Sequence, residues 1–183
     1  GAAGAYGSRF GRGSLVSEGG TAGTEEAVRA ALEWLKRHQA PDGRWSCNEF
    51  LQQCDSKKGP CTNLNKSMDY LDTGGRGWKE HDIGVTALSM LAYTGYGHTH
   101  ETGKFPEYIQ VLKKALKFLK SVQITGMNNP NYDGCFRFKV TIPKDKSKEE
   151  EIDEKQGWMY GHAIATMAVA ELLLMSGDFL HLK

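Results

Sequence analysis

The sequence lacks an excess of charge of either sign. Its 183 residues include 23 lysines and arginines against 22 aspartates and glutamates, which gives a formal net charge of +1. Nucleic-acid-binding domains usually carry a basic patch and a high isoelectric point, so this balance gives no support to a nucleic-acid partner. Charged residues make up 25% of the chain and hydrophobic residues 39%. These shares are ordinary for a globular protein with one core.

Long apolar runs and a secretory leader are also missing from the sequence. No uninterrupted apolar run approaches the roughly 18 residues that a membrane-spanning helix requires, so we expect no membrane span. The N-terminus has no charged segment followed by an apolar one, so no signal peptide is predicted. Eight of the first 23 residues are glycine, and residues 1–23 are therefore interpreted as a flexible lead-in.

The four cysteines form no recognisable metal motif. Cys47, Cys54 and Cys61 are seven residues apart in one loop-like stretch, and Cys135 lies far along the chain. Zinc sites usually contain closely spaced Cys-x2-4-Cys pairs. The other candidate ligands also lack a specific spacing: His81, Asp82, His98, His100 and His162. We therefore expect no metal and no cofactor, and favour a disulfide or free thiols over a zinc site.

Four segments have the composition of helices, and they are of two kinds. The helix starting near Thr24 and the helix following Pro106 are amphipathic, which predicts outer, half-wet helices. The helices from Asp82 to Tyr93 and from Met159 to Ser176 carry almost no charge. A helix that is apolar on nearly every side is usually buried, so these two are predicted to be inner helices. The expected fold class is all-α.

The periodicity also predicts which faces of the outer helices point inward. The inner stripe of the first is Ala27, Ala31, Trp34, Leu35 and His38. The inner stripe of the second is Tyr108, Val111, Leu112, Ala115, Leu116, Phe118 and Leu119. The opposite face of this second helix carries Lys113, Lys114, Lys117 and Lys120, which we interpret as a solvated face rather than an anion site.

Two long connections separate the outer from the inner helices. Residues 46–77 and 124–157 are polar and irregular, and loops of this length in a compact domain are usually functional or disordered. Within the second connection, Phe136, Phe138, Val140 and Ile142 alternate with polar residues. This period of two predicts a short strand or β-hairpin near 135–142. The mixed charge run from Lys144 to Lys155 is interpreted as a mobile tip.

The chain contains an internal repeat. The offset is 84 residues from Trp34 to Phe118 and from Gln39 to Gln123, and 80 residues from Trp78 to Trp158. An outer helix, a long loop and an inner helix thus occur twice, in residues 24–97 and 106–177 of one domain, 24–183. Repeats of this kind stack as supersecondary units. Equivalent loops of such an array emerge on one face, and on that rim we expect function.

The stretch from Arg29 to Trp45 resembles the QW motif of the terpenoid cyclase and protein prenyltransferase superfamily. The motif is matched by Arg29, Ala30, Trp34, Leu35, Gln39, Gly43 and Trp45, and in part again by Lys114, Ala115, Phe118, Leu119 and Gln123. Residues 24–183 look most like bacterial prenyltransferase/squalene oxidase repeat proteins, a likeness carried by 95–100 and 159–166. The resemblance implies an α/α toroid of concentric outer and inner helices, of which this chain would form a part.

The resemblance does not extend to the residues of catalysis. Squalene–hopene cyclases protonate their substrate with an aspartate of an Asp-x-Asp-Asp-Thr-Ala motif at the start of an inner helix. Residues 82–87 keep the Thr-Ala, but Gly84 and Val85 occupy the two aspartate places before it. The second inner helix has no acid at the matching positions. The zinc ligands of prenyltransferases, which are Asp, Cys and His, have no counterpart of specific spacing here either.

These observations favour a non-catalytic binding or interaction module, part of a larger protein, over an enzyme. The candidate ligand-binding residues on the rim are Trp78, His81, Asp82, Trp158, Tyr160 and His162. A packed, hydrogen-bonded role is the alternative for His162. The alternative function is a terpenoid-class enzyme, such as a terpene cyclase or prenyltransferase-like protein, or an isoprenoid- or lipid-binding toroid.

The motif itself is interpreted as a structural clip that joins one outer helix to the next. Its residues are Arg29, Trp34, Gln39, Gly43 and Trp45, with Phe118 and Gln123 in the second copy. A partial toroid would leave its inner face exposed, so self-association that completes the toroid is a further expectation.

Overall fold

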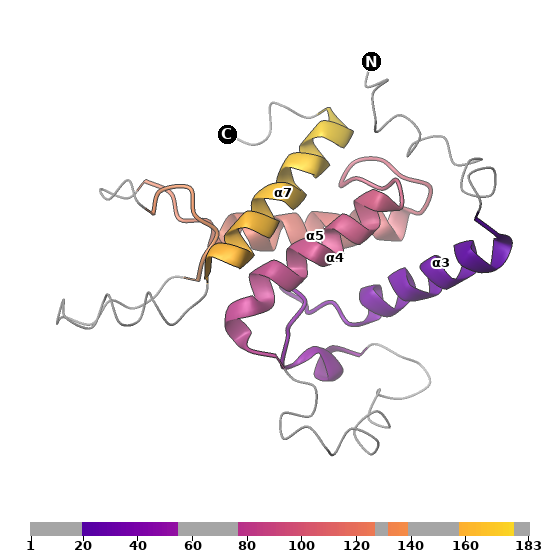
Figure 1. Ribbon diagram of the computed structural model, residues 1–183, viewed down its shortest axis with the longest axis horizontal. Coiled ribbons are helices and arrows are strands. Elements are labelled where there is room, and N and C mark those ends of the chain that lie inside the picture. The colour runs from indigo at the N-terminus through magenta and orange to yellow at the C-terminus, as the bar shows by residue number, and fades with distance from the viewer. Residues whose placement is uncertain (1–19, 55–76, 127–131, 139–157, 178–183) are drawn as a thin grey trace.

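In the computed structural model the chain is described over residues 20–54, 77–126, 132–138 and 158–177 (Figure 1). These residues form four α-helices and two short 3-10 helices and contain no β-strand, so the all-helical prediction is confirmed for them. The elements are α3 (Ala22–Arg37), η1 (Phe50–Gln53), η3 (Lys79–His81), α4 (Asp82–Gly95), α5 (Pro106–Val122) and α7 (Trp158–Ser176). The predictions for residues 1–19, for Cys61 and for the charge run 144–155 lie outside the described residues.

The first helix begins earlier than the sequence analysis predicted. Thr21, not Thr24, is the N-cap, and its side-chain oxygen accepts a hydrogen bond from the backbone N–H of Thr24 at 3.2 Å. The Thr24 hydroxyl oxygen accepts in return from the backbone N–H of Thr21 at 2.7 Å. This reciprocal pair is a capping box in which threonine takes the place of the usual glutamate or glutamine. Two helix N–H groups are satisfied in this way.

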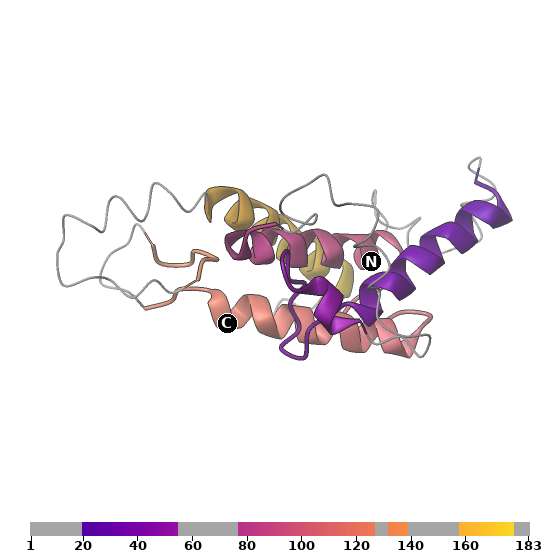
Figure 2. The ribbon, with the colours of Figure 1, turned by 90° about the horizontal axis from the view of Figure 1, so that it is seen from below.

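The two nearly uncharged helices, α4 and α7, lie side by side and run in the same direction (Figure 1). Gly84 and Gly161, each near the start of its helix, bring the backbones close together. A Cβ added to Gly84 would lie 3.4 Å from the Cα of Gly161. Helix α5 forms a second layer beneath this pair, and the N-terminal end of α3 projects away from the body (Figure 2).

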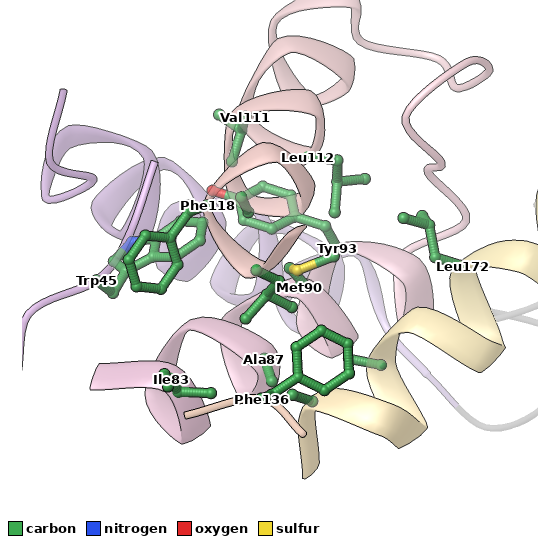
Figure 3. Packing of buried hydrophobic residues seen from close by; sticks show 14 of the residues in the cluster. Trp45, Ile83, Ala87, Met90, Tyr93, Val111, Leu112, Phe118, Phe136 and Leu172 are labelled. Atoms are coloured by element: carbon green, nitrogen blue, oxygen red, sulfur yellow. The ribbon is translucent and has the colours of Figure 1, made fainter. Parts of the chain in front are cut away.

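The core lies where α4, α5 and α7 meet (Figure 3). Its largest fully buried side chains include Met90 and Tyr93 of α4, Leu112 of α5 and Leu172 of α7. Burial of each such side chain stabilises the fold by about 1.5–3 kcal/mol. The buried Tyr93 hydroxyl donates to the carbonyl of Leu32 at 2.7 Å, which fastens α3 to this core.

The predicted inner stripe is confirmed for α5 but is partly wrong for α3. On α5 every residue of the stripe is buried except Leu116, which is half-buried. On α3, Ala27 and Ala31 are exposed, and Leu32 is the buried residue of that helix. In its first turn α3 is joined to the body by the hydrogen bond that the Tyr96 hydroxyl donates to the Glu25 carboxylate at 3.2 Å, and Ala27 and Ala31 stay exposed.

Helix α7 was expected to be buried, and only one of its faces is. Ala165, Ala168, Leu172 and Met175 are buried, whereas Met159, Tyr160, Met167 and Leu174 are between 49% and 78% exposed. The helix packs on α4 with one side, and no described residue covers the other. By length and composition α7 is the one described helix that could cross a membrane. Core helices of other proteins pass the same test, so this is weak support for a span.

The predicted strand near 135–142 is a single antiparallel bridge within the described residues. It joins Gln123 to Phe136. Around it, the Ile124 N–H donates to the Cys135 carbonyl at 2.8 Å and the Arg137 N–H to the Val122 carbonyl at 3.3 Å. Residues 139–142, which would extend a hairpin, lie outside the described part of the chain.

After each outer helix the backbone makes the same turn. In the segment that we call the first clip, 39–45, the N–H of Ala40 donates to the Arg44 carbonyl and the N–H of Gly43 to the Ala40 carbonyl, both at 2.9 Å. The Gln39 side chain then donates to the Gly43 carbonyl at 2.9 Å.

The second clip, 123–136, repeats these three bonds. The N–H of Ile124 donates to the Cys135 carbonyl at 2.8 Å, and the N–H of Gly134 donates to the Ile124 carbonyl at 2.7 Å. The Gln123 side chain donates to the Gly134 carbonyl at 3.2 Å. The two turns thus correspond bond for bond, although the second contains seven more residues between its glutamine and its glycine.

The first clip joins three helices. Besides the Gly43 carbonyl, the Gln39 amide donates to the Val111 carbonyl of α5 at 3.0 Å. The indole N–H of Trp45 returns to the Leu35 carbonyl of α3 at 2.7 Å, and the backbone N–H of Trp45 donates to the Thr86 hydroxyl of α4 at 3.0 Å. Helices that are distant in sequence are therefore held by one short turn.

We expect Gly43→Ala to destabilise the fold by about 3 kcal/mol or more, because it combines a strained backbone with overpacking. Gly43 has a φ of 99°, and a Cβ there would fall against the Lys114 carbonyl of α5. The matched control is Gly134→Ala, since Gly134 has a φ of 86° but no described atom within 4 Å of its Cβ position. Its cost should be about 1–2 kcal/mol. Equal losses in urea denaturation would contradict the close approach at Gly43.

Candidate rim at the helix N-termini

The six rim residues predicted from the sequence belong to both repeats and lie at one end of the molecule. Trp78, His81 and Asp82 lie at the start of α4, and Trp158, Tyr160 and His162 lie in the first turns of α7. Because α4 and α7 run in the same direction and η3 packs against α7, these two sets are neighbours. The 80-residue repeat therefore gives a shared rim in the folded chain.

The rim residues differ in their exposure to solvent. Trp78 is 73% exposed and Tyr160 is 78% exposed, and His81 is exposed as well. Trp158 and His162 are half-buried, and Asp82 is fully buried. Two large aromatic rings on the surface are thus available to a partner, whereas the acid is enclosed by the protein.

Asp82 is enclosed by the segment that follows the first clip. One carboxylate oxygen, Oδ1, accepts a hydrogen bond from the Cys47 N–H at 2.7 Å. The other, Oδ2, lies 3.6 Å from Nε of Arg44, and neither atom has a hydrogen-bond partner among the described residues. Burial raises the pKa of Asp82 above its ordinary value, and the Cys47 N–H and the Arg44 charge offset part of that rise.

The groups around Asp82 are held in place by further contacts. The Arg44 guanidinium also pairs with Glu49 at 3.3 Å and with Asp42 at 3.6 Å. Burial and the neighbouring Asp82 carboxylate raise the pKa of the Cys47 thiol to about 12. A thiol with such a pKa is protonated at neutral pH and is a poor nucleophile. Sequence reasoning missed both Arg44 and Cys47, because no motif marks their contact with Asp82.

His162 has a comparable position in the second repeat. Its Nδ1 accepts a hydrogen bond from the backbone N–H of Phe136 at 3.2 Å. The His162 imidazole therefore bonds the second clip to α7, as the Thr86 hydroxyl bonds the first clip to α4. Its ring centroid lies 6.0 Å from Phe136 and 6.1 Å from Trp158. The packed, hydrogen-bonded role that the sequence left open is the one that these contacts support.

Trp158 also takes part in a cation–π arrangement that the sequence did not predict. The Arg137 guanidinium carbon lies 5.4 Å from the Trp158 ring centroid and 5.0 Å from the Tyr132 ring centroid. Arg137 is only 8% exposed, and cation–π contacts strengthen when the cation is desolvated. Trp158 is thereby held by Arg137, the residue that follows the second clip, which leaves Trp78 and Tyr160 as the outward rings.

The remaining motif residues lie away from the rim. Trp34 stacks on His38 with ring centroids 3.8 Å apart, and the His38 Nδ1 bonds the Trp34 carbonyl at 2.7 Å. Phe118 is buried in the core, and Arg29 is exposed on α3. His98 lies in an aromatic stack, where its Nε2 accepts from the Phe105 N–H at 3.1 Å.

No metal centre is formed by the described residues. Among them, no group of three or more His, Cys, Asp or Glu side chains could hold a metal ion. Cys47 is a free thiol. Comparison with known protein families, with curated proteins and with solved structures gave no match.

The raised pKa of Asp82 predicts a pH dependence of stability. A carboxyl whose folded-state pKa exceeds its ordinary value of 3.8 holds its proton more tightly in the folded chain. Stability is then greatest below that ordinary value and falls as the pH rises towards the folded-state pKa. Asp82→Asn keeps an oxygen for the Cys47 N–H and does not titrate. Relative to wild type, the variant should gain stability as the pH rises from about 4. A difference that is constant with pH in urea titrations would exclude Asp82 as the titrating group.

The raised pKa of Cys47 predicts slow alkylation. At mildly alkaline pH, iodoacetamide should modify Cys47 at least about 100-fold more slowly than an unperturbed cysteine, because the thiolate is the reactive form. Asp82→Asn removes the neighbouring negative charge and should speed the reaction. Peptide mass spectrometry measures both rates, with an added unstructured cysteine peptide as the reference in the same sample. An unchanged Cys47 rate in the variant would show that the carboxylate does not act on the thiol.

Proposed function

We propose that this chain is a non-catalytic interaction module built as part of an α/α toroid, which binds a protein partner at the rim. The observation that carries this proposal is the exposure of Trp78 and Tyr160 at one end of the molecule. Trp and Tyr are enriched among the residues that dominate binding energy at protein interfaces. Met159, 58% exposed, adds an apolar contact beside them.

The toroid part of this proposal is supported by the arrangement of the helices. The two nearly uncharged helices lie parallel and adjacent, as the inner helices of such a fold would. Helix α5 carries its lysines outward, as an outer helix would. The two clips make corresponding hydrogen bonds after each outer helix. Each feature is what two consecutive units of a repeating array require.

The alternative, a terpenoid-class enzyme, has one observation in its favour. Asp82 begins an inner helix and has a raised pKa, and such perturbed groups gather at active sites. A general acid must, however, come within hydrogen-bond reach of the group it protonates. Asp82 has no exposed surface, and one of its oxygens is already bonded to Cys47. An interaction module therefore accounts for more of the rim than an enzyme does.

Photo-crosslinking and product analysis test the proposal together. A benzoylphenylalanine introduced at Trp78 should crosslink to one defined protein in an extract of the source cells, and the same probe at Lys117 should not. Lys117 lies on the solvated face of α5 and serves as the matched exposed control. Incubation with squalene and with farnesyl diphosphate should give no product.

Two outcomes would decide against the proposal. Equal crosslinking from both positions would mean that the rim has no dedicated partner. Turnover that is lost in Asp82→Asn would favour the enzyme instead, since this variant keeps the shape of the side chain and the oxygen that accepts from Cys47.

A further inference from the structure

The burial patterns of α4 and α7 are complementary when the two helices are aligned by the 80-residue repeat. Nine residues of α4 are buried, and five of them have exposed counterparts on α7. These five are Ile83, Thr86, Ala87, Met90 and Thr94, which correspond to Ala163, Thr166, Met167, Ala170 and Leu174. The counterparts of the other four are half-buried. The side of α4 that is covered in this chain is therefore the side of α7 that is bare.

The reverse relation holds on the other side of the two helices. Helix α7 packs against α4 with Ala165, Ala168, Leu172 and Met175. Their counterparts on α4 are Val85, Leu88, Ala92 and Gly95, of which the last three are exposed and Val85 is half-buried. Each helix thus has one partnered and one unpartnered side, and the unpartnered sides are those that the repeat would bring together.

The outer helices and the clips show the same relation independently. In the first clip, Gly43 lies against the Lys114 carbonyl of α5, and Gln39 donates to the Val111 carbonyl. In the second clip, a Cβ on Gly134 would meet no described atom within 4 Å. The second clip therefore makes the same turn as the first, but no described helix packs against its glycine as α5 packs against Gly43.

The 84-residue offset identifies which helix would pack against the second clip as α5 packs against the first. Val111, Leu112 and Ala115 of α5 are buried, and they correspond to Ala27, Val28 and Ala31 of α3. These three residues of α3 are exposed. Their small side chains would allow the close backbone approach that Gly43 makes with α5. Ala27 and Ala31, which the sequence predicted to face inward, are thus exposed where their counterparts on α5 are buried.

From these matched faces we infer that copies of this chain associate head to tail. The trailing face, formed by Met167, Ala170 and Leu174 with Gly134 of the second clip, receives the leading face of the next copy. The leading face consists of Leu88 and Ala92 of α4 with Ala27 and Ala31 of α3. The contact continues the packing of α7 on α4 and of the first clip on α5. It is heterologous, so it forms a ring if the rotation closes and a filament if it does not.

A second copy fits these faces better than a lipid surface does. The bare side of α7 contains Ala163, Thr166 and Ala170 between its larger residues, a pattern that suits close packing of helices. Contact with lipid would explain the exposed apolar side of α7. It would not explain why no described helix packs against Gly134, or why the alanines of α3 are exposed. This inference concerns surfaces that do not include Trp78 or His81. Its test is therefore independent of the test for a partner at the rim.

A mixing experiment tests the inference. Leu88→Glu damages the leading face and Met167→Glu the trailing face, and both residues are 52% exposed, so neither change disturbs the core. Light scattering of wild type, from micromolar to near-millimolar protein, should show assembly. Each variant alone should be monomeric, with association weakened at least about 30-fold. A mixture of the two should form a dimer, because each still offers one intact face. Lys117→Glu is the control that leaves assembly unchanged.

Three outcomes would overturn the inference. The first is a monomeric wild type at every concentration. The second is self-association of Leu88→Glu but not of Met167→Glu, which would mean that two α7 helices pair symmetrically. The third is flotation of wild type, but not of Met167→Glu, with phosphatidylcholine vesicles, which would mean that α7 faces lipid. Circular dichroism of both variants verifies that they are folded.

Discussion

The architecture depends on the close contact between the first clip and α5. Gln39 donates to two carbonyls at once, one in its own turn and one in the next outer helix. Gly43 makes this possible, since its positive φ closes the turn and its missing Cβ admits the backbone of α5. Trp45 then links the same turn to α3 and α4. Three helices thereby take their positions from a few hydrogen bonds around one glycine.

The attachment of the clips also explains why Asp82 and His162 of the rim already accept hydrogen bonds from the backbone. Each clip must fasten the chain to the following inner helix, and polar side chains in the first turns of that helix accept the backbone N–H groups. Thr86 and Asp82 accept them on α4, and His162 accepts one on α7. Residues that looked like candidates for chemistry therefore satisfy buried backbone donors, which would otherwise be costly. The surface left for recognition is aromatic.

Repetition also explains the bare surfaces. A unit of an array contributes one half of each interface that it makes, so the first and last units always present an unmatched half. In this chain one exposed half consists of the N-terminal turns of α3 and one side of α4. The other consists of the exposed side of α7 and the second clip.

The sequence by itself determined the four helices, the repeat and the inward stripe of α5. Periodicity and charge placement decide these features locally, before any packing is known. It could not decide where α3 leaves the body, which side of α7 is covered, or that Arg44 and Cys47 enclose Asp82. These depend on which neighbours are present, and a stripe of alanines looks the same whether or not a helix lies against it. The tertiary structure alone decided that no described helix packs against Gly134 of the second clip.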